Sequence, residues 1–335
     1  MRQLVLLGEA GTKRTVYFQK AAQALGVTAL LCPWAEWETQ LMEPALVKID
    51  PPVFDGCCID QQSQYLAAYQ ADLKRLAASG HAFYNTPEAV WTALDKRMCK
   101  ELLLAQGLPV TEMWPEVISS PAALRELLAS RHWPGAFVKP RFGSAAAGVL
   151  AYRWAPKSGR EVLYTCAALQ DGQLVNTKTL RRLEDHVAIE ALLSRVLARE
   201  TVVERWHAKA KHHGRVYDLR AVVQFGQLDY LVARTSRGPI TNLQLNNGAV
   251  SVEQLGLPPE VYGQIEDICQ QALAALAGLS YAGLDILLEE ETLKPYIVEV
   301  NGQGDLLYQD IFADNSIYTH QVKYFLERRG ETGWI

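Results

Sequence analysis

The sequence lacks a long hydrophobic run, a strong net charge and a paired set of cysteines. No apolar stretch in its 335 residues approaches membrane-spanning length, and the apolar run at the N-terminus is too short for a signal peptide. The net charge of -4 provides no overall field that would favour nucleic acid. The six cysteines show no C-x-x-C spacing, so we expect reduced thiols. We therefore expect a cytoplasmic globular protein with no nucleic-acid or membrane partner.

Three familiar signatures of nucleotide binding and catalysis are also missing. The Gly8-x-x-Gly11 turn lacks the third glycine and the downstream acid of a dinucleotide fingerprint. The glycine-rich stretch 141–149 lacks the Lys-Ser or Lys-Thr pair of a Walker A loop. No serine, histidine and aspartate stand at a recognisable triad spacing. The sequence therefore argues against dinucleotide binding and against a P-loop, and it gives no sign of an activated serine nucleophile.

The polar side chains of two C-terminal strands carry the strongest chemical signal. Segments 283–288 and 296–301 are short, apolar and rich in β-branched residues, which is typical of half-buried strands. Glu299 and Asn301 project from the same face because side chains alternate along a strand, and a hairpin loop would lay Asp285 beside them. Two carboxylates and an amide oxygen suit Mg²⁺. The alternative is a solvated face of an antiparallel hairpin.

A second signal is a loop of small residues that follows a strand ending in lysine. The strand is predicted at 136–140 and contains Lys139, and the loop contains Gly143, Ser144 and Gly148. Glycine and alanine strip this loop of bulky side chains, so its backbone N–H groups are able to close around phosphate oxygens. Lys139 supplies the charge that such a loop lacks. The alternative is a flexible hairpin turn.

The order of the predicted elements favours a mixed α/β and α+β chain. Strands at 4–7 and 27–31 with a helix at about 15–25 between them form a βαβ opening, which predicts a parallel sheet. Segment 161–183 is expected to be a hairpin with Asp171-Gly172 as its type I′ turn. The length leaves room for two or three domains, and we place them at residues 1–86, 87–205 and 206–335.

Two arginines are expected at the ends of paired strands beside a basic loop at 209–213. Arg220 has Asp218 two residues away on its own face, and Arg234 has no acid near it in sequence. Cations without a partner are costly unless an anion arrives, so we expect an anionic carboxylate substrate on this side. The alternative is that Arg234 pairs with an acid distant in sequence. The basic loop is expected to be solvated or to face an anion.

From about residue 85 to 326, the chain resembles the ATP-grasp superfamily, and most closely its branch of ribosomal-protein glutamate ligases and glutathione synthetases. Each motif is short, but their order along the chain is specific. The motifs are Asp95-Lys96, Gly107-Leu108-Pro109, Val138-Lys139-Pro140, Gly143-Ser144, Gly148-Val149, Val202-Val203-Glu204, Asp218-x-Arg220, Arg234, Asn242-Leu243, Asn247-Gly248, Leu284-Asp285-Ile286 and Glu299-Val300-Asn301. The resemblance implies two subdomains whose antiparallel sheets clamp ATP, after an N-terminal α/β domain with a parallel sheet.

The same resemblance implies an ADP-forming ligase that joins a carboxylate to an amine, or to a thiol, through an acyl phosphate. Arg234 and Arg220 would be catalytic, because they would stabilise the acyl phosphate and the oxyanion that follows. Asp285, Glu299 and Asn301 would bind one or two Mg²⁺ ions, with Mn²⁺ as a substitute. The adenine amino group and the ribose would meet Glu204 and the backbone after it. The complete set implied for ATP is Lys96, Lys139, Gly143, Ser144, Gly148, Glu204, Arg205, Trp206, Asp218 and Asn242, with Lys100 as the alternative to Lys96 at the phosphates.

Two other functions stay open at this point. One is a small-molecule kinase on the same fold, which would release the phosphorylated product. The other is a non-catalytic partner protein that binds nucleotide, although the presence of all three metal ligands favours an enzyme. Segments 246–249 and 302–305 depart from the usual family pattern near the acceptor. The sequence therefore leaves the carboxylate and amine substrates unnamed, small molecule or peptide, and leaves homodimer formation open.

Overall fold

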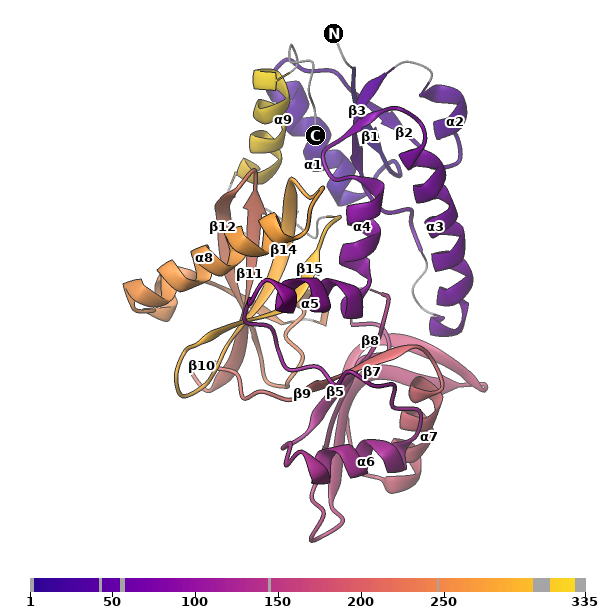
Figure 1. Cartoon of the computed structure of the whole chain (residues 1–335), viewed down its shortest axis with the longest axis vertical. Coiled ribbons are helices and arrows are strands. Elements are labelled where there is room, and N and C mark those ends of the chain that lie inside the picture. The colour runs from indigo at the N-terminus through magenta and orange to yellow at the C-terminus, as the bar shows by residue number, and fades with distance from the viewer. Residues whose placement is uncertain are drawn as a thin grey trace.

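The computed structural model of the chain describes residues 3–41, 44–54, 58–143, 146–245, 247–303 and 314–328. In this part of the chain the named strands form three sheets, one parallel and two antiparallel (Figure 1). No helix in the same part is long and apolar enough to cross a membrane. The five cysteines that it contains, Cys32, Cys58, Cys99, Cys166 and Cys269, are all unpaired.

The first sheet is parallel, as the βαβ opening predicts. Its strand order is β2-β1-β3-β4, so the chain crosses from one side of β1 to the other. Thr12 caps the first helix by accepting a hydrogen bond from the Thr15 amide. The elements are β1 (Gln3–Leu7), α1 (Lys13–Ala24), β2 (Ala29–Cys32), α2 (Trp37–Gln40), β3 (Ala45–Ile49), η1 (Ile59–Gln61), α3 (Gln62–Ala77) and β4 (Ala82–Phe83).

The second sheet is antiparallel, with the order β8-β7-β6-β5-β9. Two helices pack together against it, and their leucines share its core with Val138 and Val203. The β7–β8 hairpin turns at Asp171 and Gly172 with φ of 49° and 76°, which is the type I′ turn that the sequence predicts. The elements are α6 (Pro121–Ser130), β5 (Ala136–Pro140), β6 (Leu150–Trp154), β7 (Glu161–Gln170), β8 (Gln173–Leu183), α7 (His186–Leu197) and β9 (Thr201–Arg205).

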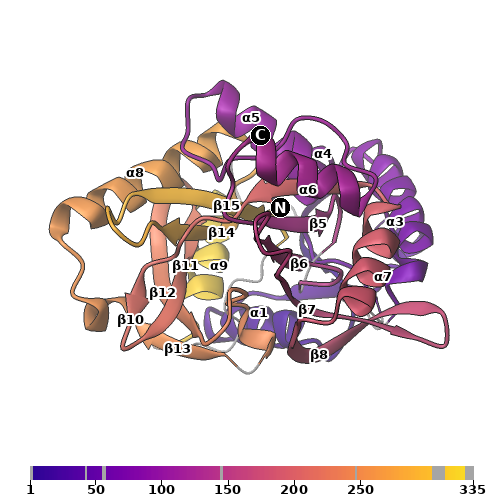
Figure 2. The ribbon, with the colours of Figure 1, turned by 90° about the horizontal axis from the view of Figure 1, so that it is seen from below.

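The third sheet is also antiparallel and has the order β13-β12-β11-β14-β15, with β10 paired to β11. Side chains alternate along β11, so Leu219 and Val223 enter a core with α8 while Val222 enters a core with α9. Figure 2 shows α8 and α9 on opposite faces of this sheet. The elements are β10 (Lys211–His212), β11 (Arg215–Gln224), β12 (Gln227–Ser236), η2 (Leu243–Leu245), β13 (Gly248–Ser251), η3 (Val252–Leu255), α8 (Pro259–Ala275), β14 (Tyr281–Leu288) and β15 (Pro295–Asn301).

Three helices connect the sheets. Helix α4 (Pro87–Leu94) begins at the Thr86 cap, and α5 (Lys96–Ala105) follows directly after Asp95. Ala89 and Leu103 from these helices belong to the core of the third sheet, although they precede the second sheet in sequence. Helix α9 (Ser316–Arg328) returns to the first sheet, where it lies beside α1 (Figure 1). The predicted C-terminal domain, residues 206–335, therefore contains a helix that packs against the predicted N-terminal domain, residues 1–86.

Candidate functional site

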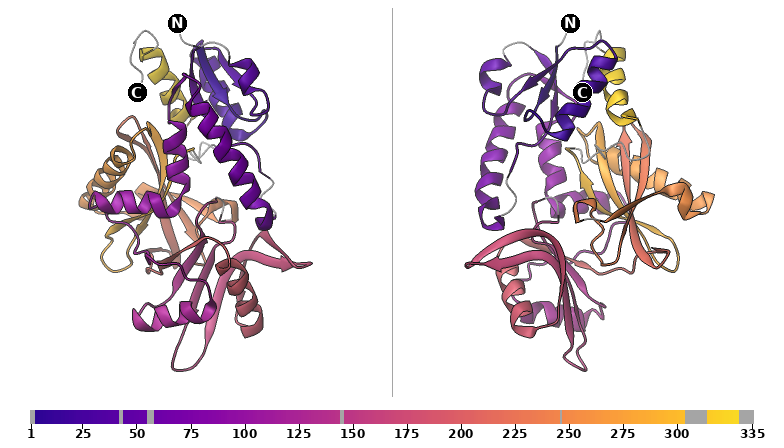
Figure 3. Two further views of the ribbon diagram at one scale, coloured as in Figure 1. Left: turned by 45° about the vertical axis from the view of Figure 1, so that its right-hand side comes forward. Right: turned by 180° about the vertical axis from the view of Figure 1, so that it is seen from behind.

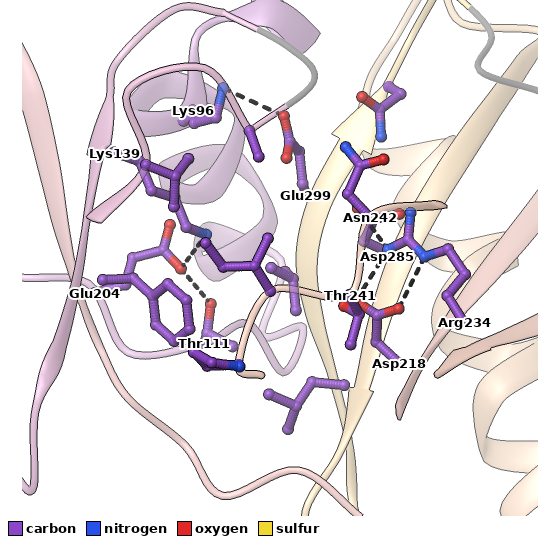
Figure 4. Close-up of a pocket in the computed structure, with 18 of the residues that line it drawn as sticks. Lys96, Thr111, Lys139, Glu204, Asp218, Arg234, Thr241, Asn242, Asp285 and Glu299 are labelled. Carbon is purple, nitrogen blue, oxygen red and sulfur yellow. Dashed lines mark hydrogen bonds and ion pairs between the residues drawn. The ribbon is translucent and has the colours of Figure 1, made fainter. Parts of the chain in front are cut away.

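One pocket between the second and third sheets brings most of the predicted site residues together (Figure 4). The second sheet contributes residues of β5, β9 and the glycine-rich loop. The third sheet contributes residues of β11, β12, β14 and β15. The predicted residues that line the pocket are Lys96, Lys139, Gly143, Glu204, Arg205, Asp218, Arg220, Arg234, Asn242, Asp285, Glu299 and Asn301.

Two predicted residues lie elsewhere, and Ser144 falls outside the described residues. Trp206 is not on the pocket lining; its ring packs against Phe137 and against the Arg153 guanidinium, which lies 4.0 Å from the ring centroid. Gly148 is also absent from the lining; its φ is 70° and a Cβ there would lie 2.9 Å from Pro140, so glycine is needed to form the turn.

The backbone after Glu204 is engaged in strand pairing. The Arg205 N–H donates to the Glu112 carbonyl at 2.8 Å, and the Trp206 N–H donates to the Gly135 carbonyl at 2.9 Å. The sequence implied that this backbone holds the nucleobase and ribose. In the structure these two N–H groups are therefore already used within the protein, and the role that the resemblance implies for this backbone stays a prediction.

The carboxylate of Glu204 is buried between two lysines and a hydroxyl. Its Oε2 lies 2.6 Å from Lys100 Nζ and 2.9 Å from Lys139 Nζ, and it accepts a hydrogen bond from the Thr111 hydroxyl at 2.9 Å (Figure 4). Its Oε1 is buried and has no hydrogen-bond partner among the described residues. Burial raises the pKa of Glu204, but Lys100 and Lys139 outweigh it and lower the pKa to about 2. The group is therefore ionised at neutral pH.

The three predicted metal ligands meet on one hairpin, as the strand pattern predicts. Asp285 of β14 is paired with Glu299 of β15, and Asn301 stands opposite Gly283. Each carboxylate has a basic partner: Arg220 Nε is 2.7 Å from Asp285, and Lys96 Nζ is 3.2 Å from Glu299. In the part of the chain that the structure describes, no group of three or more His, Cys, Asp or Glu side chains could hold a metal ion. The candidate set is instead two carboxylates and one amide.

This donor set fits a hard divalent cation. All its ligand atoms would be oxygens, because Asn301 already uses its amide nitrogen to donate to the Gly283 carbonyl at 3.3 Å. Mg²⁺ prefers oxygen ligands and usually keeps waters and phosphate oxygens in its remaining positions. Three oxygen donors on one pocket wall match that preference.

The expectation that the two arginines lack acidic partners is wrong. Arg234 donates two parallel hydrogen bonds to Asp218, from Nε to Oδ1 at 2.8 Å and from Nη2 to Oδ2 at 2.9 Å. Its Nη2 also lies 3.0 Å from Asp285 Oδ2. The alternative interpretation, pairing with an acid distant in sequence, is therefore the observed one. β11 and β12 place Asp218 directly opposite Arg234, although sixteen residues separate them.

The basic loop divides into a buried and an exposed lysine. The Lys209 side chain is 11% exposed, lines the pocket, and contacts the Thr241 hydroxyl at 2.9 Å and Asp218 at 3.4 Å. Burial lowers its pKa, against the pull of Asp218. Lys211 is half exposed and pairs with Glu290. The sequence predicts a loop that is solvated or faces an anion; Lys211 is in the first setting, and Lys209 faces the Asp218 carboxylate.

Four polar residues on the pocket wall are absent from the predicted site residues, although the basic loop that contains Lys209 was expected beside the two arginines. They are Thr111, His207, Lys209 and Thr241. Burial lowers the pKa of His207, and Arg205 lowers it further, so the imidazole is neutral at pH 7. No motif marks any of these positions, because each reaches the wall through packing between separate elements.

The start of the glycine-rich loop is fastened to the start of α5. Asp95 caps α5 by accepting from the Arg97 and Met98 amides, and it also holds the Arg141 guanidinium at 2.6 and 2.9 Å. Lys96 Nζ donates to the Gly143 carbonyl at 2.7 Å. The same lysine therefore links the loop to Glu299 on the opposite wall.

No protein-family model matches the chain, and no curated protein sequence is similar to it. Solved structures are similar over nearly the whole length. The ATP-grasp ligase PsnB, in complex with a precursor variant, Mg and ADP, has a TM-score of 0.61 at 16% identity and covers 98% of this chain and 97% of its own. The D-cycloserine synthetase DcsG has a TM-score of 0.63 at 16% identity, with coverage of 96% and 98%. The D-alanine–D-alanine ligase from Bacillus anthracis in complex with ATP has a TM-score of 0.60 at 13% identity, with coverage of 99% for both chains.

The chain therefore has the ATP-grasp fold. The mixed architecture of one parallel and two antiparallel sheets, which the resemblance implies, is confirmed. The particular branch within the superfamily stays a prediction.

Proposed function

We propose that the chain is an ATP- and Mg²⁺-dependent ligase that joins a carboxylate to an amine. The observation that carries this proposal is the pocket itself. A single cavity between two antiparallel sheets holds a buried acceptor for a base, lysines beside a glycine-rich loop, and three oxygen donors for a cation. Solved proteins of the same fold are described as ligases in complex with ADP and Mg, or with ATP, which supports this choice of ligands.

The nucleotide would lie across the pocket from β9 to β15. Apolar side chains of Phe137, Leu287 and Val298 line the pocket and suit a flat base, and Phe137 stands opposite Glu204 across β5 and β9. Lys139 and Lys96 are placed to meet the phosphates beside Gly143. Asp285, Glu299 and Asn301 would hold Mg²⁺, which offsets the charge of the β- and γ-phosphates.

The reaction proceeds in two steps. A substrate carboxylate oxygen attacks the γ-phosphorus, the bond to the β,γ-bridging oxygen breaks, and ADP leaves an acyl phosphate behind. The substrate amine then attacks the acyl carbon and loses a proton, and inorganic phosphate leaves as the amide forms. Arg234 stands beside Asp285 and is held rigidly by Asp218, so it offers a fixed cation to the oxyanion of the second step.

The substrates would be amino acids or peptides. Structures of PsnB and of the macrocyclase MdnC from Microcystis aeruginosa contain precursor peptides, and the Bacillus anthracis enzyme is named for joining two D-alanines. In the part of this chain that the structure describes, Arg220, Arg234 and Lys209 share two carboxylates, those of Asp218 and Asp285. This wall of the pocket therefore keeps an excess of positive charge there and would receive the carboxylate partner.

The test is ADP release from Mg·ATP in a screen of amino acids, dipeptides and dicarboxylates, with mass analysis of the product. Glu299→Gln should abolish ADP release while the far-UV spectrum stays unchanged, because it removes one ligand charge at constant volume. Glu291→Gln, in the exposed turn of the same hairpin, is the control and should retain full activity. Normal turnover in Glu299→Gln at millimolar Mg²⁺ would contradict the metal assignment.

The same screen separates the two alternative functions. Accumulation of a phosphorylated product would indicate a kinase, and nucleotide binding without ADP release would indicate a non-catalytic protein.

A further inference from the structure

We propose that one face of helix α3 positions two parts of the pocket at once. Gln62 on this face holds the start of the glycine-rich loop, and Tyr69 holds the segment that follows the candidate metal ligand Asn301. Both are positioning residues. The inference rests on the proposed function, because it requires that the pocket bind a nucleotide and Mg²⁺.

Helix α3 is anchored at both of its ends. Leu73 and Leu76 near its C-terminal end pack in a core that they share with strands of the first sheet. At its N-terminal end, Ile59 enters the core of the second sheet, and its carbonyl accepts from Arg199 Nη1 at 2.9 Å. Gln62 and Tyr69 lie between these anchors on the same face, because seven residues make about two turns of an α-helix.

Gln62 closes one side of Gly143, which lines the pocket. A Cβ at position 143 would overlap with Nε2 of Gln62, so the buried Gln62 side chain fills the space that a larger residue would need. Gly143 has a φ of 130°, a conformation that glycine adopts readily. On the other side, its carbonyl accepts from Lys96 Nζ at 2.7 Å. The start of the loop is therefore held between α3 and α5.

Tyr69 holds the chain just after β15. Its hydroxyl accepts a hydrogen bond from Gln303 Nε2, and both side chains are buried. Gln303 follows Asn301 by two residues. The carbonyl of Gly302, between them, accepts from Asn85 Nδ2 at 2.6 Å. The backbone that leaves Asn301 is therefore fixed at two successive residues, which limits where Asn301 is able to present its amide oxygen.

The two contacts should act on different ligands. Gly143 lies beside the lysines that would meet the phosphates, whereas Asn301 belongs to the oxygen donors for the cation. Neither Gln62 nor Tyr69 is on the pocket lining, so each acts through the residue that it holds. Loss of the Gln62 amide should weaken nucleotide binding with or without Mg²⁺. Loss of the Tyr69 hydroxyl should reduce only the part of the affinity that Mg²⁺ provides.

The experiment measures ADP binding to the full chain by calorimetry, once with Mg²⁺ and once in EDTA. Gln62→Ala should weaken ADP by roughly three- to 30-fold in both conditions, because the start of the loop loses one of its two supports. Tyr69→Phe should keep the affinity in EDTA and lower the gain from Mg²⁺ several-fold. The matched controls are Gln64→Ala, an exposed glutamine of α3, and Tyr65→Phe, whose hydroxyl donates to the Pro52 carbonyl. Both controls should behave as wild type in both conditions.

A double-mutant cycle tests the contact between Gln62 and Gly143 directly. Gly143→Ala should weaken ADP because its Cβ overlaps with Gln62 and because alanine is strained at this φ. In the Gln62→Ala background the overlap disappears and only the strain remains. The loss caused by Gly143→Ala should therefore be roughly three- to tenfold smaller in that background.

Several outcomes would overturn the proposal. Equal ADP affinities for Gln62→Ala and Gln64→Ala would remove the role of Gln62, and so would additive losses in the cycle. A wild-type gain from Mg²⁺ in Tyr69→Phe would remove the role of Tyr69. If Gln62→Ala fails to fold, Gln62→Asn replaces it and must weaken ADP in both conditions. Wild-type protein that does not bind Mg·ADP would contradict the proposed function itself, which separates that failure from this one.

Discussion

Individual residues in the pocket are arranged as carboxylates shared between cations. Glu204 lies between Lys100 and Lys139, and Asp218 lies between Arg234 and Lys209. Burial raises the pKa of Asp218, but the charges of Arg234 and Lys209 hold it well below its usual range. A buried ion is tolerated only when partners compensate it, so each cluster depends on all its members.

The Asp218 cluster should be strongly destabilised if the charge of its central carboxylate is removed. Asp218→Asn would leave Arg234 and Lys209 buried with less negative charge between them, and should destabilise the protein by about 3–5 kcal/mol. Urea unfolding at pH 7 measures this. The control is Glu290→Gln, which breaks the partly exposed pair with Lys211 and should cost about 1 kcal/mol or less. Equal stabilities for the two variants would mean that Asp218 contributes nothing beyond a surface pair.

Single elements of the fold are governed largely by local chemistry. The β7–β8 hairpin has two consecutive residues at positive φ, Asp171 and Gly172, because a type I′ turn matches the twist of its strands. Helices α4, α6 and α7 begin at Thr86, Ser120 and Asp185, each of which accepts a backbone hydrogen bond in the first turn. These features need no distant contact.

A glycine in the hairpin turn, Gly172, and a glycine inside helix α8, Gly263, should respond in opposite ways to substitution by alanine. Gly172→Ala meets no neighbouring atom within 4 Å, so its whole effect is the strain of φ 76°, and it should cost about 1 kcal/mol. Gly263→Ala also meets no atom, but it lies inside α8 with ordinary helical φ, and should stabilise the protein by about 0.5–1 kcal/mol. Thermal unfolding of both variants checks the opposite signs. A stabilised Gly172→Ala would refute the turn assignment.

The whole molecule is joined at places far apart in sequence. Figure 3 shows α3 extending from the first sheet towards the β7–β8 hairpin. There Asp60 accepts from the Leu174 amide at 2.9 Å and pairs with Arg195 at 3.1 Å and with Arg199. Burial raises the pKa of Asp60, but the Leu174 amide and the two arginines outweigh it, so the pKa is lowered. The Asp60 carboxylate therefore helps to join the segment before α3 to the second sheet, beside the bond from Arg199 to the Ile59 carbonyl and the bridge between Cys58 and Val175.

Neutralising this carboxylate should loosen the junction. Asp60→Asn at pH 7 should speed hydrogen exchange in residues 59–62 and 173–176 several-fold, with little change in the core of the third sheet. Asp72→Asn, farther along α3, is the control because Asp72 pairs only within its own helix and with nothing on the second sheet among the described residues.

The stability that Asp60 contributes should also depend on pH. Because the pKa of Asp60 is lowered in the folded protein, this stability is present above the ordinary pKa of 3.8 and is lost as pH falls below it. Wild type should therefore resemble the variant only at pH values below 3.8. Unchanged exchange in Asp60→Asn would refute the tie.

The sequence by itself determined what depends on short-range periodicity and turn chemistry. The two-residue repeat of a strand places Glu299 and Asn301 on one face, and a hairpin places Asp285 beside them, as observed. The ends of β5 and the type I′ turn follow from the same local rules. Tertiary structure alone decided the pairing of Arg234 with Asp218, the burial of Lys209 and the convergence of Lys100 and Thr111 on Glu204. These contacts depend on strand register and on which elements pack together, and a side chain's type does not reveal the partner that a distant segment brings to it.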